Sequence, residues 1–140
     1  MTQNTGTRQT ALVATPIIRV FRILSAIVLF AIAGIHLFLV FDGVGGLLGV
    51  LFILNAVAGI VLGIGMLALR GMLFTLATVL GVLFAIASLV ALLLALSVGL
   101  FGITETWTFT LVPQTVVVDS IGIVVLAITL ILLLRRRSVS

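Results

Sequence analysis

The 140-residue chain is too apolar to be a soluble domain. Hydrophobic residues make up 64% of it and charged residues only 7%, whereas soluble domains carry about 45–50% and about 25%. The net charge of +4 comes from seven arginines, with no lysine, against three acids. In so apolar a chain the arginines are best explained as topology signals and lipid-headgroup contacts, and no nucleic acid is expected as a partner. The absence of cysteine excludes disulfides, thiolate metal ligands and cysteine-based catalysis.

In chain order, the sequence predicts a polar tail, four membrane-spanning helices and a basic tail. Residues 1–15 are polar and threonine-rich, and we expect a flexible cytoplasmic tail before Pro16, which suits the first turn of a helix. About 20 apolar residues cross the hydrocarbon layer as a helix. Four such runs predict helices at about 17–41, 47–69, 72–100 and 116–134. The predicted fold is an all-α, integral membrane bundle of four transmembrane helices over residues 16–134, followed by a basic cytoplasmic tail at 135–140.

The connections between the apolar runs set the order of the helices. The short turn DGVGG joins the first two runs, and Arg70-Gly71 joins the second and third. Helices joined so closely must be antiparallel neighbours. The only long connection is FGITETWTFTLVPQT, residues 101–115. The bundle is therefore expected to run up-down-up-down.

The charged residues test this arrangement independently of hydropathy. All basic residues fall on one side of the predicted spans: Arg8, Arg19, Arg22, Arg70, Arg135, Arg136 and Arg137. All acids fall on the other side: Asp42, Glu105 and Asp119. Because arginine marks the cytoplasmic side, we expect both termini in the cytoplasm and a multi-pass protein of the plasma membrane. Trp107 and Phe109 then lie at the outer interface, where aromatic rings favour the headgroup region.

His36, the only histidine, is the leading candidate for a functional side chain. It lies six residues before Asp42, about 9 Å below the outer end of its helix, and Asn55 lies about 12 Å below the same end of the next helix. A hydrogen bond between them is sterically reasonable, and each needs a partner because an unsatisfied polar group in hydrocarbon costs several kcal/mol. The pair either stabilises the packing of the two helices through hydrogen bonding or belongs to a proton-responsive or ligand-binding pocket. One histidine without cysteine does not make a metal or haem site, so no metal and no cofactor is expected.

The three acids are a candidate acidic rim on the outer side. They either attract cations or supply paired carboxylates for acid–base work, or they merely lie away from the cytoplasm. Asp119 has two interpretations. If its helix begins near Val116, the carboxyl lies one turn inside and could meet His36 or Asn55. If the helix begins at Asp119, the residue is an N-terminal cap that faces the helix dipole, which is the interpretation we favour.

Two of the predicted helices carry small residues at helical spacing. One stripe consists of Asn55, Gly59 and Gly63, and the other of Gly81, Ala85 and Ser88. Small faces let helices approach closely, and packing within one chain is the default expectation.

The segment TETWTFT, residues 104–110, alternates threonine with larger side chains, which is typical of a strand. A single short strand is not stable alone. We therefore expect an extended loop across the outer face, with Trp107 and Phe109 in the headgroups or against helix ends. Such a loop could serve as a lid or as a partner-binding edge.

Residues 34–67 read GIHLFLVFDGVGGLLGVLFILNAVAGIVLGIGML. This block resembles a pattern in uncharacterised small four-helix membrane proteins of high-GC prokaryotes, which share GIHL at the end of the first helix, a glycine-bearing turn and LF-LNAVAG-VL in the second. The resemblance covers the first hairpin, implies the four-helix architecture, and marks His36 and Asn55 without implying an activity. Many of that group have a longer polar turn in place of DGVGG, so no site formed by the turn is implied.

No sequence motif assigns a reaction. The nucleotide loops, hydrolase elbows and zinc helix motifs are absent, and an enzyme is not expected because the groups for acid–base chemistry do not converge. Two alternatives remain. The first is a non-catalytic membrane protein, an accessory or partner-binding subunit. The second is a small oligomeric transporter or channel that uses His36 and Asn55. The expected partners are the lipid bilayer and either a membrane protein or further copies of the chain.

Overall fold

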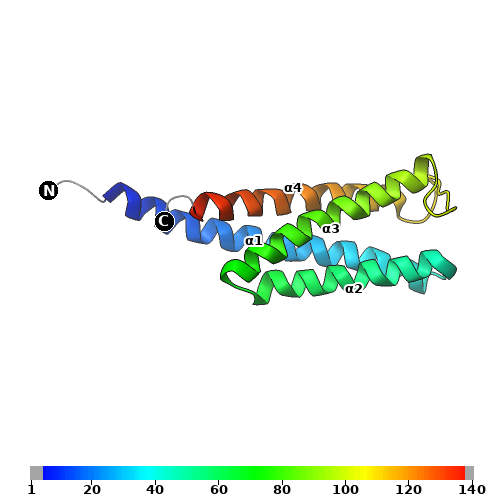
Figure 1. Ribbon diagram of the computed structural model, residues 1–140, viewed down its shortest axis with the longest axis horizontal. Coiled ribbons are helices and arrows are strands. Elements are labelled where there is room, and N and C mark those ends of the chain that lie inside the picture. Colours follow the sequence, from blue (N-terminus) through cyan, green and yellow to red (C-terminus); the bar gives the residue numbers. More distant parts are fainter. Residues whose placement is uncertain (1–4, 138–140) are drawn as a thin grey trace.

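The computed structural model consists of four long helices lying side by side (Figure 1). It describes the backbone of residues 5–137 and the side chains of residues 16–136. The helices are α1 (Thr5–Phe41), α2 (Gly46–Ala68), α3 (Gly71–Ser97) and α4 (Val112–Arg137), and no strand occurs in this part of the chain. Successive helices run in alternate directions along the bundle, as the colours in Figure 1 show.

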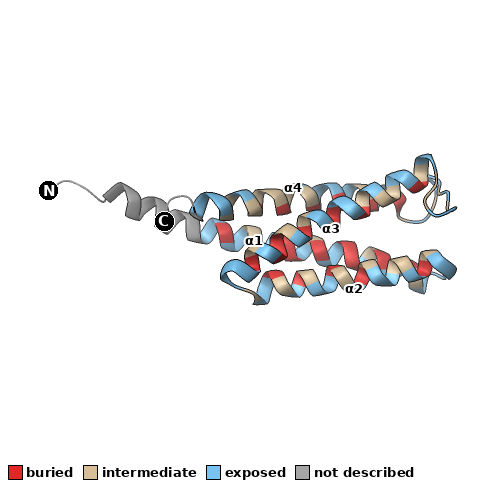
Figure 2. Cartoon of the chain, viewed as in Figure 1, coloured by how far each residue is buried: buried red, intermediate tan, exposed pale blue. Residues whose placement is uncertain are grey.

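All four helices are long and apolar enough to cross a bilayer. The spans that meet this condition are Pro16–Phe41, Gly46–Ala68, Gly71–Ser97 and Val112–Arg136. Figure 2 shows buried residues gathered where the helices face one another and exposed residues on the outward faces. Those outward faces are apolar, with Leu54 60% exposed and Val61 61% exposed, which suits contact with lipid. The predicted all-α membrane bundle is thus confirmed, and the chain is a multi-pass membrane protein.

Helix α1 begins earlier than the sequence predicts. It begins at Thr5 rather than near residue 17, so Pro16 lies inside the helix and not in its first turn. Extending an existing helix costs far less than nucleating one, which allows the polar segment to continue it despite the bond that proline cannot donate. The predicted tail is therefore helical from Thr5. Residues 1–4 lie outside the described residues, and the flexibility of the tail stays a prediction.

Helix α4 also begins earlier than predicted, at Val112 rather than near residue 116. Pro113 is its second residue, and a proline is tolerated in the first turn because the missing N–H would have no partner there. The other boundaries lie closer to the prediction, although α3 ends at Ser97 and not at residue 100. Gly99, with φ +86, follows this end in the left-handed conformation common after helices.

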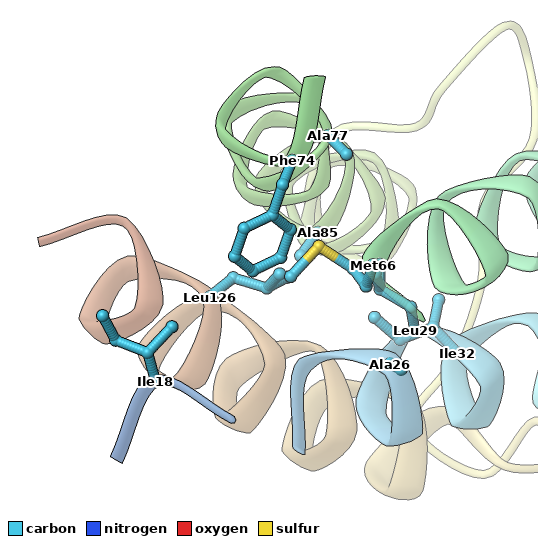
Figure 3. Close-up of a cluster of buried hydrophobic side chains, with 9 residues drawn as sticks. All are labelled: Ile18, Ala26, Leu29, Ile32, Met66, Phe74, Ala77, Ala85 and Leu126. Atoms are coloured by element: carbon cyan, nitrogen blue, oxygen red, sulfur yellow. The ribbon is translucent and has the colours of Figure 1, made fainter. Parts of the chain in front are cut away.

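Two levels of packing hold the bundle together near its middle. Figure 3 shows the buried apolar cluster, which consists of Ile18, Ala26, Leu29, Ile32, Met66, Phe74, Ala77, Ala85 and Leu126. Five members are fully buried, and three of these, Leu29, Ile32 and Leu126, are here called the apolar layer. Next to it, Ser25 and Thr129 join α1 to α4 through hydroxyl groups 2.8 Å apart. Such a bond satisfies two groups that would be costly to leave unpaired in hydrocarbon.

Helices α1 and α2 approach each other closely at two glycines. A Cβ on Gly59 would lie 2.9 Å from Ala33 Cβ and 3.0 Å from the Leu29 carbonyl oxygen, and one on Gly63 would lie 2.7 Å from the Phe30 ring. The predicted small face of α2 therefore packs within the chain, against α1. Helices α2 and α3, in contrast, diverge from their connection at Arg70 toward their other ends (Figure 1).

The bundle has two chemically different ends. One end, here called the arginine end, holds the Arg70 connection and the last turn of α4. The other, the loop end, holds the turn 42–45 and the segment 98–111 (Figure 1). The alternating threonines in that segment do not form a strand, and its only ladder contact is an isolated bridge between Leu100 and Ile103. The expectation of a loop rather than a strand is thus confirmed.

Candidate functional site

A cavity of about 120 Å³ lies inside the loop end of the bundle. All four helices and the segment 98–111 contribute to its wall, which is mostly leucine, phenylalanine and alanine. The polar side chains on the wall are His36, Asn55, Ser88, Glu105, Thr110 and Thr115. The cavity thus joins the two residues that the sequence singled out, one on α1 and one on α2, to groups from α3, α4 and the loop.

His36 is buried, at 7% exposure, and its ring is held by two contacts. Its Nδ1 lies 2.8 Å from the carbonyl oxygen of Ile32, one turn earlier in α1. Phe52 of α2 meets the ring edge-on, with ring centroids 5.2 Å apart at 83°. Because a carbonyl only accepts, Nδ1 must carry the proton, and in the neutral ring Nε2 is then an acceptor.

Asn55 bonds to α3 and not to His36. Its Nδ2 donates to the Ser88 hydroxyl oxygen at 3.2 Å, while its Oδ1 is buried without a hydrogen-bond partner among the described residues. The His36–Asn55 bond considered from the sequence is therefore not formed, although both residues line the cavity. Their depth along the helices is similar, as expected, but each side chain turns to a different neighbour.

Asp119 is an interior residue of α4 and not its cap. The helix begins at Val112, so Asp119 lies about two turns inside, and its side chain is 0% exposed. The cap interpretation is wrong because Pro113, and not Asp119, lies in the first turn. Both Asp119 carboxyl oxygens lack a hydrogen-bond partner in the described part of the chain, and the Ser88 hydroxyl lies beside them. Asp119 therefore belongs to the polar cluster behind the cavity and not to an exposed rim.

The other two acids lie at the loop end, in different surroundings. Asp42 is exposed in the turn between α1 and α2. Glu105 is half-buried on the cavity wall, and this burial raises its pKa above the ordinary value because the charged form loses hydration. Of the predicted acidic rim, these two acids alone are near the surface.

The two predicted interface aromatics also separate. Trp107 is 58% exposed at the loop end. Phe109 is half-buried and lines the cavity, so it acts as part of the cavity wall. The segment 98–111 therefore covers the cavity with Phe109 while it presents Trp107 outward, and contact of Trp107 with headgroups stays a prediction.

The arginine end carries the predicted basic anchors. Arg22 donates to the carbonyl oxygens of Leu67 and Leu69, the latter at 2.8 Å, and its guanidinium lies 4.7 Å from the centre of the Phe74 ring. Arg19 is exposed, and Arg70 lies at the connection between α2 and α3. Arg135 and Arg136 each have an interaction partner. The side chains of Arg8 and Arg137 lie outside the described ones.

The chemistry that the cluster offers is hydrogen-bond acceptance. No three residues among His, Asp and Glu gather closely enough to hold a metal ion in the described part of the chain. Sequence reasoning placed Ser88 only on a packing stripe and did not connect Thr115 or Glu105 with His36. Thr115 could have been found, since it lies one turn before Asp119 on the same face of α4.

Comparisons with known proteins add no assignment. No family model, no curated protein and no solved structure matches the chain.

Proposed function

We propose that this chain is a non-catalytic integral membrane protein that acts by binding, as an accessory or partner-binding subunit, and that the loop-end cavity is its binding site. The cavity carries the proposal. It is largely apolar with a few converging polar groups, which is the usual character of small-molecule sites. Asn55 on the wall and Asp119 behind it have buried acceptor oxygens that find no hydrogen-bond partner among the described residues, and a bound donor group would supply one.

The hydrogen bonds of the cluster favour binding over catalysis. Nucleophilic catalysis needs a nucleophile bonded to a base that a third group orients. The Nδ1 of His36 is engaged with its own helix. The Ser88 hydroxyl group lies beside the Asp119 carboxyl group, but no third group among the described residues orients that carboxyl group. Among the described side chains this arrangement supports recognition and offers no activated nucleophile.

The apolar layer argues against the alternative of a transporter or channel. Ser25 and Thr129 form the next polar level toward the arginine end, and Thr129 lies about 15 Å along α4 from Asp119. On α1, the fully buried Leu29 and Ile32 lie between Ser25 and His36. On α4, the fully buried Leu126 lies between Asp119 and Thr129. Within the described part of a single chain, buried apolar side chains therefore separate the cavity from the polar level at Ser25 and Thr129.

Native mass spectrometry of protein extracted directly from its membranes tests the proposal. We expect a bound small molecule or a partner subunit on the unaltered protein. Ala91→Trp fills the cavity from α3 and should remove that species, whereas Ala87→Trp, one turn away on the exposed face of the same helix, should retain it. Protein that carries nothing beyond bulk lipid, or a species equally retained by both variants, would contradict the proposal.

A further inference from the structure

The described ionisable groups around the cavity include no arginine. The wall and the cluster behind it contribute two acids, Glu105 and Asp119, and one histidine, whereas none of the arginines with described side chains lines the cavity. Arg22, the deepest of the described arginines along α1, is engaged with the carbonyl groups of Leu67 and Leu69. The field inside the loop end is therefore negative or neutral, and no basic side chain of the described chain compensates it there.

The buried polar atoms that lack a hydrogen-bond partner among the described residues are all acceptors. Asn55 Oδ1 and both carboxyl oxygens of Asp119 are buried without partners in the described part of the chain. Ser88 lies between them, since it accepts from Asn55 Nδ2 and its own hydroxyl hydrogen is free for Asp119. The neutral His36 ring adds one more acceptor, because its proton is on Nδ1. Buried acceptors without donors cost free energy that a ligand bearing N–H groups would recover.

The remainder of the cavity fits a short apolar body. Leucine and phenylalanine side chains such as Leu92 and Phe52 make up most of the wall. The volume of about 120 Å³ is slightly below the roughly 150 Å³ of an engineered apolar cavity that binds benzene. A molecule of about five non-hydrogen atoms therefore fits, on that comparison.

From these three observations we propose that the cavity binds a small primary alkylammonium ion, with its alkyl body among the apolar side chains and its ammonium group against Asn55 and Ser88 on the wall, where the Asp119 carboxyl group lies behind them. This inference rests on the proposed binding function and specifies its ligand class. The ammonium group offers three donors and a positive charge, which is what the acceptor cluster lacks.

Three probes of equal length test the charge selection directly. Binding of n-butylammonium, 1-butanol and butyrate is measured by calorimetry and thermal unfolding at constant ionic strength. The detergent is a nonionic maltoside, so that no cationic headgroup competes. We expect n-butylammonium to bind at least about tenfold more tightly than 1-butanol, as a charge-assisted hydrogen bond gives, and butyrate not to bind.

Two matched variants locate the effect. Asp119→Asn keeps the shape and should weaken n-butylammonium binding about tenfold, while Asp42→Asn makes the same change on the exposed turn and should leave it unchanged. If Asp119→Asn does not fold, Ala91→Trp provides the second variant, because filling the cavity should abolish binding altogether.

The outcomes separate this inference from the function on which it rests. Equal binding of 1-butanol and n-butylammonium, preference for butyrate, or equal effects of Asp119→Asn and Asp42→Asn would each overturn the ammonium site while leaving a binding cavity intact. If none of the probes binds but native mass spectrometry still finds a cavity-dependent ligand, the ammonium class alone is wrong. If the protein is bare in both experiments, the proposed function is wrong as well.

Discussion

Arg22 lies in α1 but completes the end of α2. The last four carbonyl groups of any helix have no partner within it, and Arg22 reaches across to two carbonyl groups at this end, those of Leu67 and Leu69. Its planar guanidinium also stacks over Phe74 at the start of α3. One side chain thus ties three helices together at the arginine end.

Replacing Arg22 by methionine should lower the free energy of unfolding by about 1–3 kcal/mol, because it removes the donor to the carbonyl oxygens of Leu67 and Leu69 and the charged group over the Phe74 ring. The measurement is unfolding by SDS in mixed micelles. Arg22→Lys should recover only part of the loss, since lysine keeps the charge but lacks the fork and the stacking plane. Arg19→Met, at an exposed position one turn earlier, should change the value by less than about 0.5 kcal/mol. Equal losses in the two methionine variants would mean that charge at this end, and not the carbonyl contacts, is what stabilises the bundle.

For single residues, the sequence predicts how deep a side chain lies along its helix better than it predicts which side chains it contacts. Counting residues from the helix ends puts His36 and Asn55 at similar depth, and both line one cavity. Which neighbour each side chain meets depends on the rotation of each helix about its axis, and hydropathy in lipid does not determine that rotation. Asn55 meets Ser88 for this reason, and Asp119 joins them from α4.

At the scale of helices, the contact between α1 and α2 depends on glycine. Gly59→Ala should destabilise the bundle by about 1–3 kcal/mol, because the new Cβ meets backbone that cannot move aside. Gly63→Ala should cost less, since the atom it meets is the far end of the Phe30 ring, which can turn. Gly34→Ala is the matched control, with nothing within 4 Å of its Cβ, and should be neutral or slightly stabilising. The same unfolding assay ranks the three variants, and an equal loss for Gly34→Ala would show that close packing of α1 against α2 is not what makes Gly59 important.

The helices themselves were predictable because their apolar runs are long and uninterrupted. The prediction of 47–69 for α2 lies within one residue of Gly46–Ala68 at each end. The predicted starts of α4 and α1 were wrong because local chemistry sets those boundaries. Pro113 lies in the first turn of α4, and α1 includes the polar segment before Pro16. The Asp119 error followed directly, since a helix start placed too late makes an interior acid look like a cap.

At the scale of the whole molecule, the cavity is a consequence of how the helices are arranged. Helices α2 and α3 diverge toward the loop end (Figure 1), and the segment 98–111 covers that end with residues such as Phe109. Neither the divergence nor the path of this irregular segment follows from hydropathy. The separation of charge could be predicted from the sequence. The order of the spans alone places the arginines at one end of the bundle and the acids toward the other.

The orientation of the bundle in the membrane is open to a direct test, since the chain has no cysteine. Asp42→Cys introduces a thiol at the exposed turn of the loop end, and Met72→Cys introduces one at the arginine end, where Met72 is 78% exposed. Arginine-rich ends remain in the cytoplasm. We therefore expect a membrane-impermeant maleimide to label Asp42→Cys on intact cells and to label Met72→Cys only after permeabilisation. The reverse labelling pattern would show that the arginine end lies outside the cell. Labelling of both variants on intact cells would mean that the chain inserts in two orientations, and the arginines would then not determine the topology.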